Sequence, residues 1–147
     1  MKNMKKFIAT LMCAAVAFTS FGFQSVRAEE AVKEVVPIDA EHFPDENFRK
    51  CVVINSDKDD DGWLDSNEIK NTWNLYCENS KIYSIKGVEY FTELQGLWCK
   101  GNNISEMDLS KNTKLLSVWC SYNPLTELDL SNCTNLVWVY CFNCKLQ

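Results

Sequence analysis

Histidine is almost absent from this 147-residue chain, and His42 is its single imidazole. Nucleophilic catalysis by a Ser/His/Asp or Cys/His arrangement would have to use that one residue. His42 lies where a helix is predicted to start, a place where a surface or capping role is the ordinary one. Most of the clustered carboxylates fit a metal-binding loop instead. The sequence therefore predicts a protein that is not an enzyme.

Basic residues and long apolar runs are also scarce. Lysine and arginine total 15 against 20 acidic residues, which gives a net charge of −5. This balance argues against nucleic acid and anionic membrane surfaces as partners. Only one long apolar run occurs, Phe7 to Phe23. No second run approaches the roughly 20 residues that cross a bilayer, so no membrane span is expected.

The first 28 residues have the pattern of a secretory signal peptide. Three lysines within residues 2–6 precede the apolar run, and Val26-Arg27-Ala28 resembles an A-x-A cleavage site. Removal of residues 1–28 takes away four basic side chains and moves the net charge to −9. We expect residues 29–38 to be a linker and the protein to be secreted, with an extracellular location.

An acidic loop predicts a calcium site. Residues Asp57 to Glu68 fit the calcium-loop template D-x-[DN]-x-[DN]-G-x5-E at every constrained position. The predicted ligands are Asp57, Asp59, Asp61, the backbone carbonyl of Trp63, Asp65 and Glu68. The five predicted carboxylate ligands, all within twelve residues, repel one another without a cation. A solvated acidic turn is the alternative, but it would not require Gly62, Leu64 and Glu68 together.

This loop is expected within a small helical cap, residues 39–71. Pro44, followed by Asp45 and Glu46, is typical of a helix start. A single calcium loop has no second loop with which to pair, so sensor-style opening is not expected. We expect Ca²⁺ to lock the cap against the segment that follows it.

Residues 72–147 repeat, first with a step of 22 residues and then with a step of 21. The pattern is L-x-x-L-x-C-x-x-N/C-x-L, a leucine-rich repeat in which cysteine replaces the third leucine. About three and a half coils of such a repeat stack to share one core, with parallel strands. The residues predicted to point inward are Leu75, Leu97, Val118 and Val139, together with Cys77, Cys99, Cys120 and Cys141.

The four repeat cysteines allow three interpretations. A zinc site would need convergence on one point, whereas these cysteines lie along a line. Disulfides between neighbouring coils would suit the Cα spacing, but parallel side-chain vectors fit the bond geometry poorly. Buried free thiols behave as small hydrophobic groups, and we favour that interpretation. It implies a reducing or anaerobic setting outside the cell.

The combination resembles secreted bacterial leucine-rich repeat proteins of the internalin type, which carry an EF-hand-like N-terminal cap. The matching segments are Phe43 to Arg49, Asp57 to Glu68, Gly87 to Phe91 and the L-x-x-L-x-C coils. The resemblance covers residues 39–147 and implies an α+β fold, with a small helical cap before a short solenoid. It also implies a surface recognition or adhesion module.

Two departures from this family pattern bear on the end of the chain. The usual longer repeat array is missing, and the last coil stops halfway round at Gln147 with no polar capping repeat. An open last coil would expose strand edge and core, which invites self-association. The chain is alternatively expected to be a truncated product of a longer surface protein.

Outward-facing aromatic residues mark the expected binding surface. Neighbours of inward residues on a strand point to the opposite face. The predicted ligand-binding residues on the concave face are Tyr76, Trp98, Trp119, Trp138 and Tyr140. A protein ligand is the first expectation, because aromatic residues are enriched at binding hot spots. A glycan is the second, and rings that merely cover and stabilise the sheet are the alternative to both.

Overall fold

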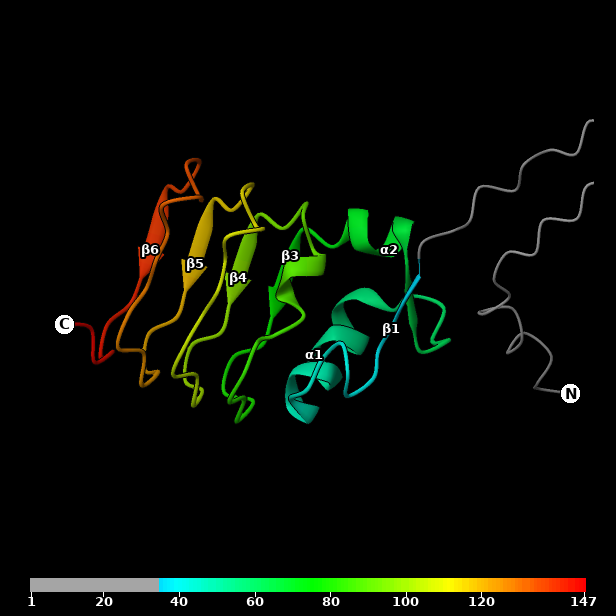
Figure 1. Ribbon diagram of the computed structural model, residues 1–147, viewed down its shortest axis with the longest axis horizontal. Coiled ribbons are helices and arrows are strands. Elements are labelled where there is room, and N and C mark those ends of the chain that lie inside the picture. Colours follow the sequence, from blue (N-terminus) through cyan, green and yellow to red (C-terminus); the bar gives the residue numbers. More distant parts are fainter. Residues whose placement is uncertain (1–34) are drawn as a thin grey trace, which may run out of the picture. The chain divides into compact units, whose positions relative to one another are not determined.

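A computed structural model describes residues 35–147, so the predicted signal peptide and the first part of the predicted linker lie outside the described residues. The described chain contains helices, a short 3₁₀ segment and two separate sheets (Figure 1). In chain order the elements are β1 (Val35–Pro37), α1 (Glu46–Ser56), β2 (Trp63–Asp65), α2 (Ser66–Asn71), β3 (Asn74–Tyr76), η1 (Val88–Tyr90), β4 (Gly96–Trp98), β5 (Ser117–Trp119) and β6 (Trp138–Tyr140).

The repeats form a four-stranded parallel sheet in the order β3-β4-β5-β6. Figure 1 shows these strands side by side, each followed by a loop that returns the chain to the next strand. Equivalent repeat positions are paired: Leu75 with Leu97, Leu97 with Val118, and Val118 with Val139. This register confirms the predicted leucine-rich repeat with parallel strands.

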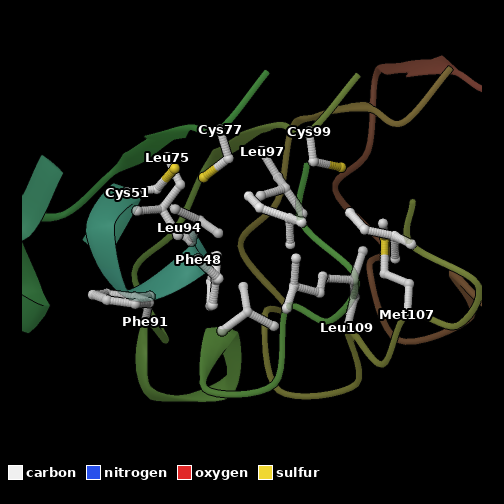
Figure 2. Close-up of a cluster of buried hydrophobic side chains, with 14 of the residues drawn as sticks. Phe48, Cys51, Leu75, Cys77, Phe91, Leu94, Leu97, Cys99, Met107 and Leu109 are labelled. Carbon is white, nitrogen blue, oxygen red and sulfur yellow. The ribbon is translucent and has the colours of Figure 1, made fainter. Parts of the chain in front are cut away.

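The core runs through the coils as predicted, except at the last strand. Fully buried side chains include Leu75, Leu97, Cys77 and Cys99, which Figure 2 labels. Val118 and Cys120 are also fully buried. Val139 is 41% exposed and Cys141 is half-buried, because β6 is the edge strand of the described sheet. All seven cysteines in the described part of the chain are free thiols. Burial raises the pKa of Cys120 to about 12, so this group stays neutral at pH 7.

An asparagine at the turn after β4 satisfies four backbone groups at once. The Asn102 Nδ2 atom donates to the carbonyls of Cys77 (2.7 Å) and Cys99 (2.8 Å). Its Oδ1 atom accepts from the amides of Ser80 (2.9 Å) and Ile82 (3.1 Å). Asn102 is itself buried, and these bonds join one coil to the next where water cannot reach.

The hydrogen bonds that Asn102 forms between coils are repeated in later coils and make up an asparagine ladder, although the last coil has a cysteine at the equivalent position. Asn123 donates to the carbonyls of Cys99 and Cys120, both at 2.9 Å, and accepts from the Ile104 amide at 3.0 Å. At the equivalent position Cys144 offers only a thiol, whose Sγ lies 3.5 Å from the Cys120 carbonyl. A thiol is a weak donor, so the final turn is held less firmly.

A second ladder runs along the opposite side of the coils, and the sequence analysis did not identify it. Asn112 Nδ2 donates to the carbonyls of Val88 (2.9 Å) and Phe91 (3.0 Å). One coil later, the Cys133 thiol lies 3.6 Å from the carbonyls of Leu109 and Asn112. Cys133 therefore has a polar contact in addition to its apolar packing.

The N-terminal cap, which we define as residues 35–73, is built around α1. The Asp45 side chain caps this helix by accepting from the amides of Asn47 and Phe48, both at 2.9 Å. The buried face of α1 is made by Phe48, Cys51, Val52 and Ser56. The periodic apolar positions therefore place the helix against the first coil.

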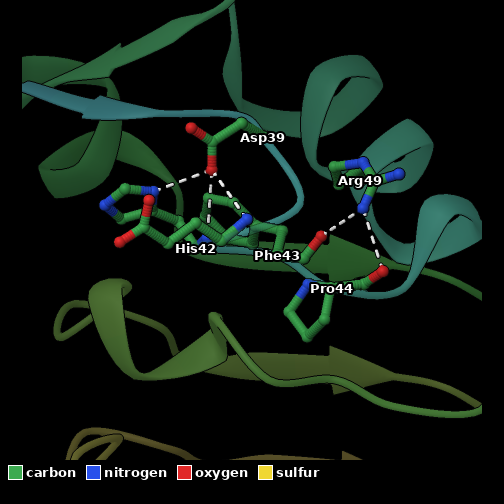
Figure 3. Close-up of polar contacts among 6 residues, drawn as sticks. Asp39, His42, Phe43, Pro44 and Arg49 are labelled. Carbon is green, nitrogen blue, oxygen red and sulfur yellow. Dashed lines mark hydrogen bonds and ion pairs between the residues drawn. The ribbon is translucent and has the colours of Figure 1, made fainter.

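Short polar contacts fix the chain on its way into α1 (Figure 3). Asp39 Oδ1 accepts from the amide of His42 and lies 2.8 Å from His42 Nδ1. The side-chain hydrogen bond with His42 lowers the pKa of Asp39 below its usual value. Arg49 donates to the backbone carbonyls of Phe43 and Pro44. His42 thus has a local structural contact.

The end of the expected linker takes part in the cap. β1 pairs in antiparallel register with β2, with Val36 opposite Leu64. The Ile38 amide also donates to the Gly62 carbonyl at 3.1 Å. The central part of the acidic loop is therefore braced by a strand that precedes α1 in the chain.

Within residues 35–147, every helix is too short or too polar to cross a bilayer.

Replacement of Asn102 by alanine is expected to lower the free energy of unfolding by about 3 kcal/mol, since it leaves buried donors and acceptors unpaired. Urea denaturation followed by circular dichroism measures the change. Asn103→Ala is the matched control, because Asn103 is the adjacent asparagine and its side chain is exposed. Equal loss in the two variants would contradict the role assigned to Asn102.

Candidate functional site

Three predicted calcium ligands converge in the loop between α1 and β2. Single carboxylate oxygens of Asp57, Asp59 and Asp61 all lie within 4.8 Å of one another. Asp57 is 8% exposed, and it accepts from the amides of Asp61 (3.2 Å) and Gly62 (3.1 Å). Gly62 has φ +81°, a left-handed conformation that glycine adopts without strain. The loop therefore folds back around its first aspartate.

The other predicted carboxylate ligands, Asp65 and Glu68, are hydrogen-bonded and do not belong to this converging group of three. Asp65 caps α2 and forms a reciprocal capping box with Glu68. The Glu68 carboxylate accepts from the amides of Lys58 (2.7 Å) and Asp65 (2.9 Å). Glu68 thus bridges both ends of the loop. Trp63 starts β2, and its amide donates to Asp61 Oδ1 at 2.8 Å.

The donor set of the loop suits a hard cation. Calcium takes six to eight oxygen ligands from carboxylates, backbone carbonyls and water. Asp57, Asp59 and Asp61 supply converging oxygens, and the residues that could complete the shell are Trp63, Asp65 and Glu68. Each Glu68 oxygen has a further lone pair besides the one that its backbone hydrogen bond occupies. The residues present therefore fit calcium.

Side chains of α1 attach the cap to the first coil, and the sequence analysis did not identify these contacts. Asn55 exchanges hydrogen bonds with the backbone of Tyr76, donating to its carbonyl (3.3 Å) and accepting from its amide (3.2 Å). Asp45 Oδ2 accepts from the Tyr83 amide at 2.8 Å, and Asn47 donates to the Lys81 carbonyl at 3.1 Å. No spacing in the sequence indicates that these residues of the cap and the first coil are hydrogen-bonded partners, because they lie far apart in the chain.

The predicted aromatic residues lie on the solvent face of the parallel sheet. Tyr76 and Trp138 are more than half exposed, Trp119 is 36% exposed, and Trp98 and Tyr140 are half-buried. Their backbones lie in register on neighbouring strands. The structure thus brings all five predicted residues onto one surface, which we call the aromatic face.

Four of the five rings of the aromatic face form two pairs. Tyr76 and Trp98 are stacked, with ring centroids 4.7 Å apart and an interplanar angle of 21°. Trp119 and Tyr140 lie 4.6 Å apart at 49°, and Tyr140 also contacts Phe142 at 6.2 Å. The rings of the first pair are nearly parallel and cover one face of each other, whereas those of the second group are tilted.

A glycine sets the orientation of Trp98. A Cβ built on Gly96 would overlap the indole of Trp98, so that ring lies over the backbone of its own strand. In the next strand Ser117 occupies the equivalent position and accepts from Trp119 Nε1 at 2.9 Å. The sequence places both rings on this face, but it does not show that Gly96 makes room for one of them.

Comparison with known proteins identifies internalins as relatives. No family model matches the chain. Over 71 residues it is 36% identical to Internalin J of Listeria monocytogenes, an alignment that covers 48% of this chain and 8% of that protein. The chain therefore spans a small part of the length of this curated relative. The sequence similarity supports an internalin-like leucine-rich repeat protein.

Solved internalin structures agree with this result. A functional domain of InlJ from Listeria monocytogenes, described as including a cysteine ladder, has a TM-score of 0.71 and 32% identity over 78% of this chain and 25% of its own. InlF from the same species has a TM-score of 0.70 and 28% identity over 76% of this chain and 34% of its own. InlC2 shares the fold, with a TM-score of 0.68 and 23% identity over 79% and 52% of the respective chains.

Substitution of Gly96 by alanine is expected to displace the Trp98 ring and break its stack on Tyr76. The near-ultraviolet circular dichroism of the aromatic residues should fall, and unfolding should become easier by about 1–3 kcal/mol through overpacking. Ser105→Ala is the control, because Ser105 is exposed and lies outside the sheet strands. An unchanged aromatic spectrum in Gly96→Ala would contradict the arrangement.

Proposed function

We propose that this internalin-like leucine-rich repeat chain is a secreted recognition or adhesion module that binds a protein ligand on its aromatic face. One observation carries the proposal: five outward-facing aromatic side chains share the solvent face of an in-register parallel sheet. Short strands joined through the buried asparagine ladder hold these side chains at fixed spacing. Such preorganisation limits the entropy lost on binding.

A protein ligand fits the chemistry of this face better than a charged polymer does. Tryptophan and tyrosine dominate the binding energy of protein interfaces when they are desolvated at the centre of a contact. Glu78 and Lys100, of opposite charge, follow Tyr76 and Trp98 by two residues, and both are exposed. An aromatic centre with a charged rim is the usual arrangement of a protein-binding surface.

A glycan is the second candidate, and the Tyr76–Trp98 pair favours it. The two nearly parallel rings, with centroids 4.7 Å apart, cover one face of each other, and the outer face of such a stack is a surface against which the apolar face of a sugar ring can lie. The tilted Trp119–Tyr140 pair fits that role less well.

The proposal assigns calcium a structural role in the cap. Asp57, Asp59 and Asp61 would hold the ion, with Trp63, Asp65 and Glu68 available to complete its shell. The bound ion would neutralise the repulsion among the loop carboxylates. Because an ion that binds only the folded state stabilises it by mass action, calcium would raise the stability of the cap.

The secreted location rests on the sequence of residues 1–28. Its lysines, apolar run and cleavage site have the order expected of a signal peptide. The acidic loop also suits extracellular conditions, where modules of this kind often bind calcium at about 10⁻⁴–10⁻³ M.

The double substitution Trp98→Ala and Trp119→Ala is expected to weaken ligand binding at least tenfold while the sheet stays folded. Binding should be measured on a panel of purified extracellular protein domains and, in parallel, on a glycan array. Tyr83→Ala is the control, since Tyr83 is 66% exposed and lies outside the sheet strands. Ligands retained at full affinity by the double variant would refute binding at the aromatic face. Hits confined to the glycan array would show that the ligand is a sugar and not a protein.

Calcium is expected to raise the melting temperature and to change the fluorescence of Trp63, relative to chelator with magnesium absent. Asp59→Ala should lose most of this response, because it removes one converging oxygen. Asp60→Asn removes the same charge from the same loop, and asparagine tolerates the left-handed φ of +56° there. This control should respond as the unsubstituted protein does. An identical response in the two variants, or none in the unsubstituted protein, would contradict calcium ligation by the loop.

A further inference from the structure

Two cysteines from different parts of the chain face each other beneath the cap. Cys51 lies on the buried side of α1, and Cys77 follows β3 in the first coil. Figure 2 shows their sulfur atoms pointing toward one another across the boundary between helix and coil. The two thiols are hydrogen-bonded. Cys51 is 7% exposed and Cys77 is fully buried.

This pair differs in geometry from the cysteines of the repeat. Cys77, Cys99 and Cys120 follow neighbouring parallel strands at equivalent positions, and Figure 2 shows the sulfur atoms of Cys77 and Cys99 turned away from each other. A disulfide needs the two Cβ atoms to approach with the sulfurs between them. Cys51 approaches Cys77 from an opposing element with its sulfur directed at that of Cys77, whereas the neighbouring repeat cysteines Cys77 and Cys99 do not face each other (Figure 2).

The cap contacts hold Cys51 in place. Asn55, one helical turn further along α1, donates to the Cys51 carbonyl at 2.7 Å. The same side chain exchanges two hydrogen bonds with the backbone of Tyr76, the residue before Cys77. One asparagine therefore ties the helical turn that carries Cys51 to the strand end that carries Cys77.

We propose that Cys51 and Cys77 form an oxidation site at which a small peroxide generates a disulfide between the cap and the first coil. The site goes beyond the recognition function, and it requires neither calcium nor a ligand on the aromatic face. The cross-link closes a loop of chain that contains the whole acidic segment Asp57 to Glu68. A closed loop restricts the unfolded chain and so stabilises the docked cap.

The reaction balances with one peroxide as the oxidant. The Cys51 thiolate attacks one oxygen of hydrogen peroxide, the O–O bond breaks, and hydroxide leaves, so that Cys51 becomes a sulfenic acid. The Cys77 sulfur then attacks the Cys51 sulfur and expels its hydroxyl group, which leaves as water with the Cys77 proton. Overall, two thiols and one hydrogen peroxide give one disulfide and two waters.

The electrostatics assign the first step to Cys51. The hydrogen bond from the Cys77 thiol lowers the pKa of Cys51 to about 6, although burial opposes this shift. The same hydrogen bond, together with burial, raises the pKa of Cys77. Of the two thiols, Cys51 therefore loses its proton more readily, and it is also the more exposed. A small peroxide suits such a site better than a bulky disulfide reagent.

The test treats the reduced protein with one equivalent of hydrogen peroxide in the presence of chelator. Remaining thiols are then alkylated and the peptides mapped by mass spectrometry without reduction. We expect a Cys51–Cys77 linked peptide as the main product. The melting temperature should rise by several degrees and return to its starting value after dithiothreitol is added.

Variants separate this site from general oxidation of the core. Cys51→Ser should abolish both the linked peptide and the rise in melting temperature. Cys99→Ser should retain both the linked peptide and the rise in melting temperature, because Cys99 occupies the equivalent position in the next coil and does not face Cys77. A main product linking Cys77 to Cys99, or oxidation of Cys51 without a cross-link, would overturn the proposal. Because the mapping is done on the unsubstituted protein, the test stands even if a variant fails to fold.

Discussion

The structure depends on the satisfaction of backbone polar groups between coils where water is excluded. Each coil contributes only three strand residues, too few to hold a fixed register unaided. Asn102 and Asn123 supply the remaining bonds by reaching the carbonyls and amides of the preceding coil. Once these bonds fix the turn, leucine and cysteine must point inward and the aromatic residues outward. The core and the aromatic face thus follow from one constraint.

Periodic features of this fold could be predicted from the sequence. The 21-residue step specified the register of Leu97 and Val118, and the alternation along each strand assigned Trp98 and Trp119 to the outer face. The loop template likewise placed Asp57, Asp59 and Asp61 together. Each of these features repeats at a fixed spacing or obeys a local rule, so neighbouring residues contain the information.

Features that join distant segments could not be predicted in the same way. Asn55 bonds to Tyr76, more than 20 positions away, and no periodic signal identifies the two as partners. Asn112 and Cys133 do recur at the 21-residue step, but their residue types alone do not show that both reach carbonyls of the preceding coil. The pairing of β1 with β2 was missed because three residues at the end of an expected linker have no distinctive pattern. The approach of Cys51 to Cys77 depends on how α1 docks, which only the assembled structure shows.

The two oxygens of Asp45 serve different parts of the protein. One caps the first turn of α1, and the other accepts from the amides of Tyr83 and Ser84 in the first coil. A single carboxylate thereby couples helix initiation to docking, so the cap and the repeats should fold as one cooperative unit. The cap would therefore not transfer readily to another repeat protein. A cap grafted onto another repeat array would keep its helix start but lose its anchor unless the new first coil presented two free amides at the same place.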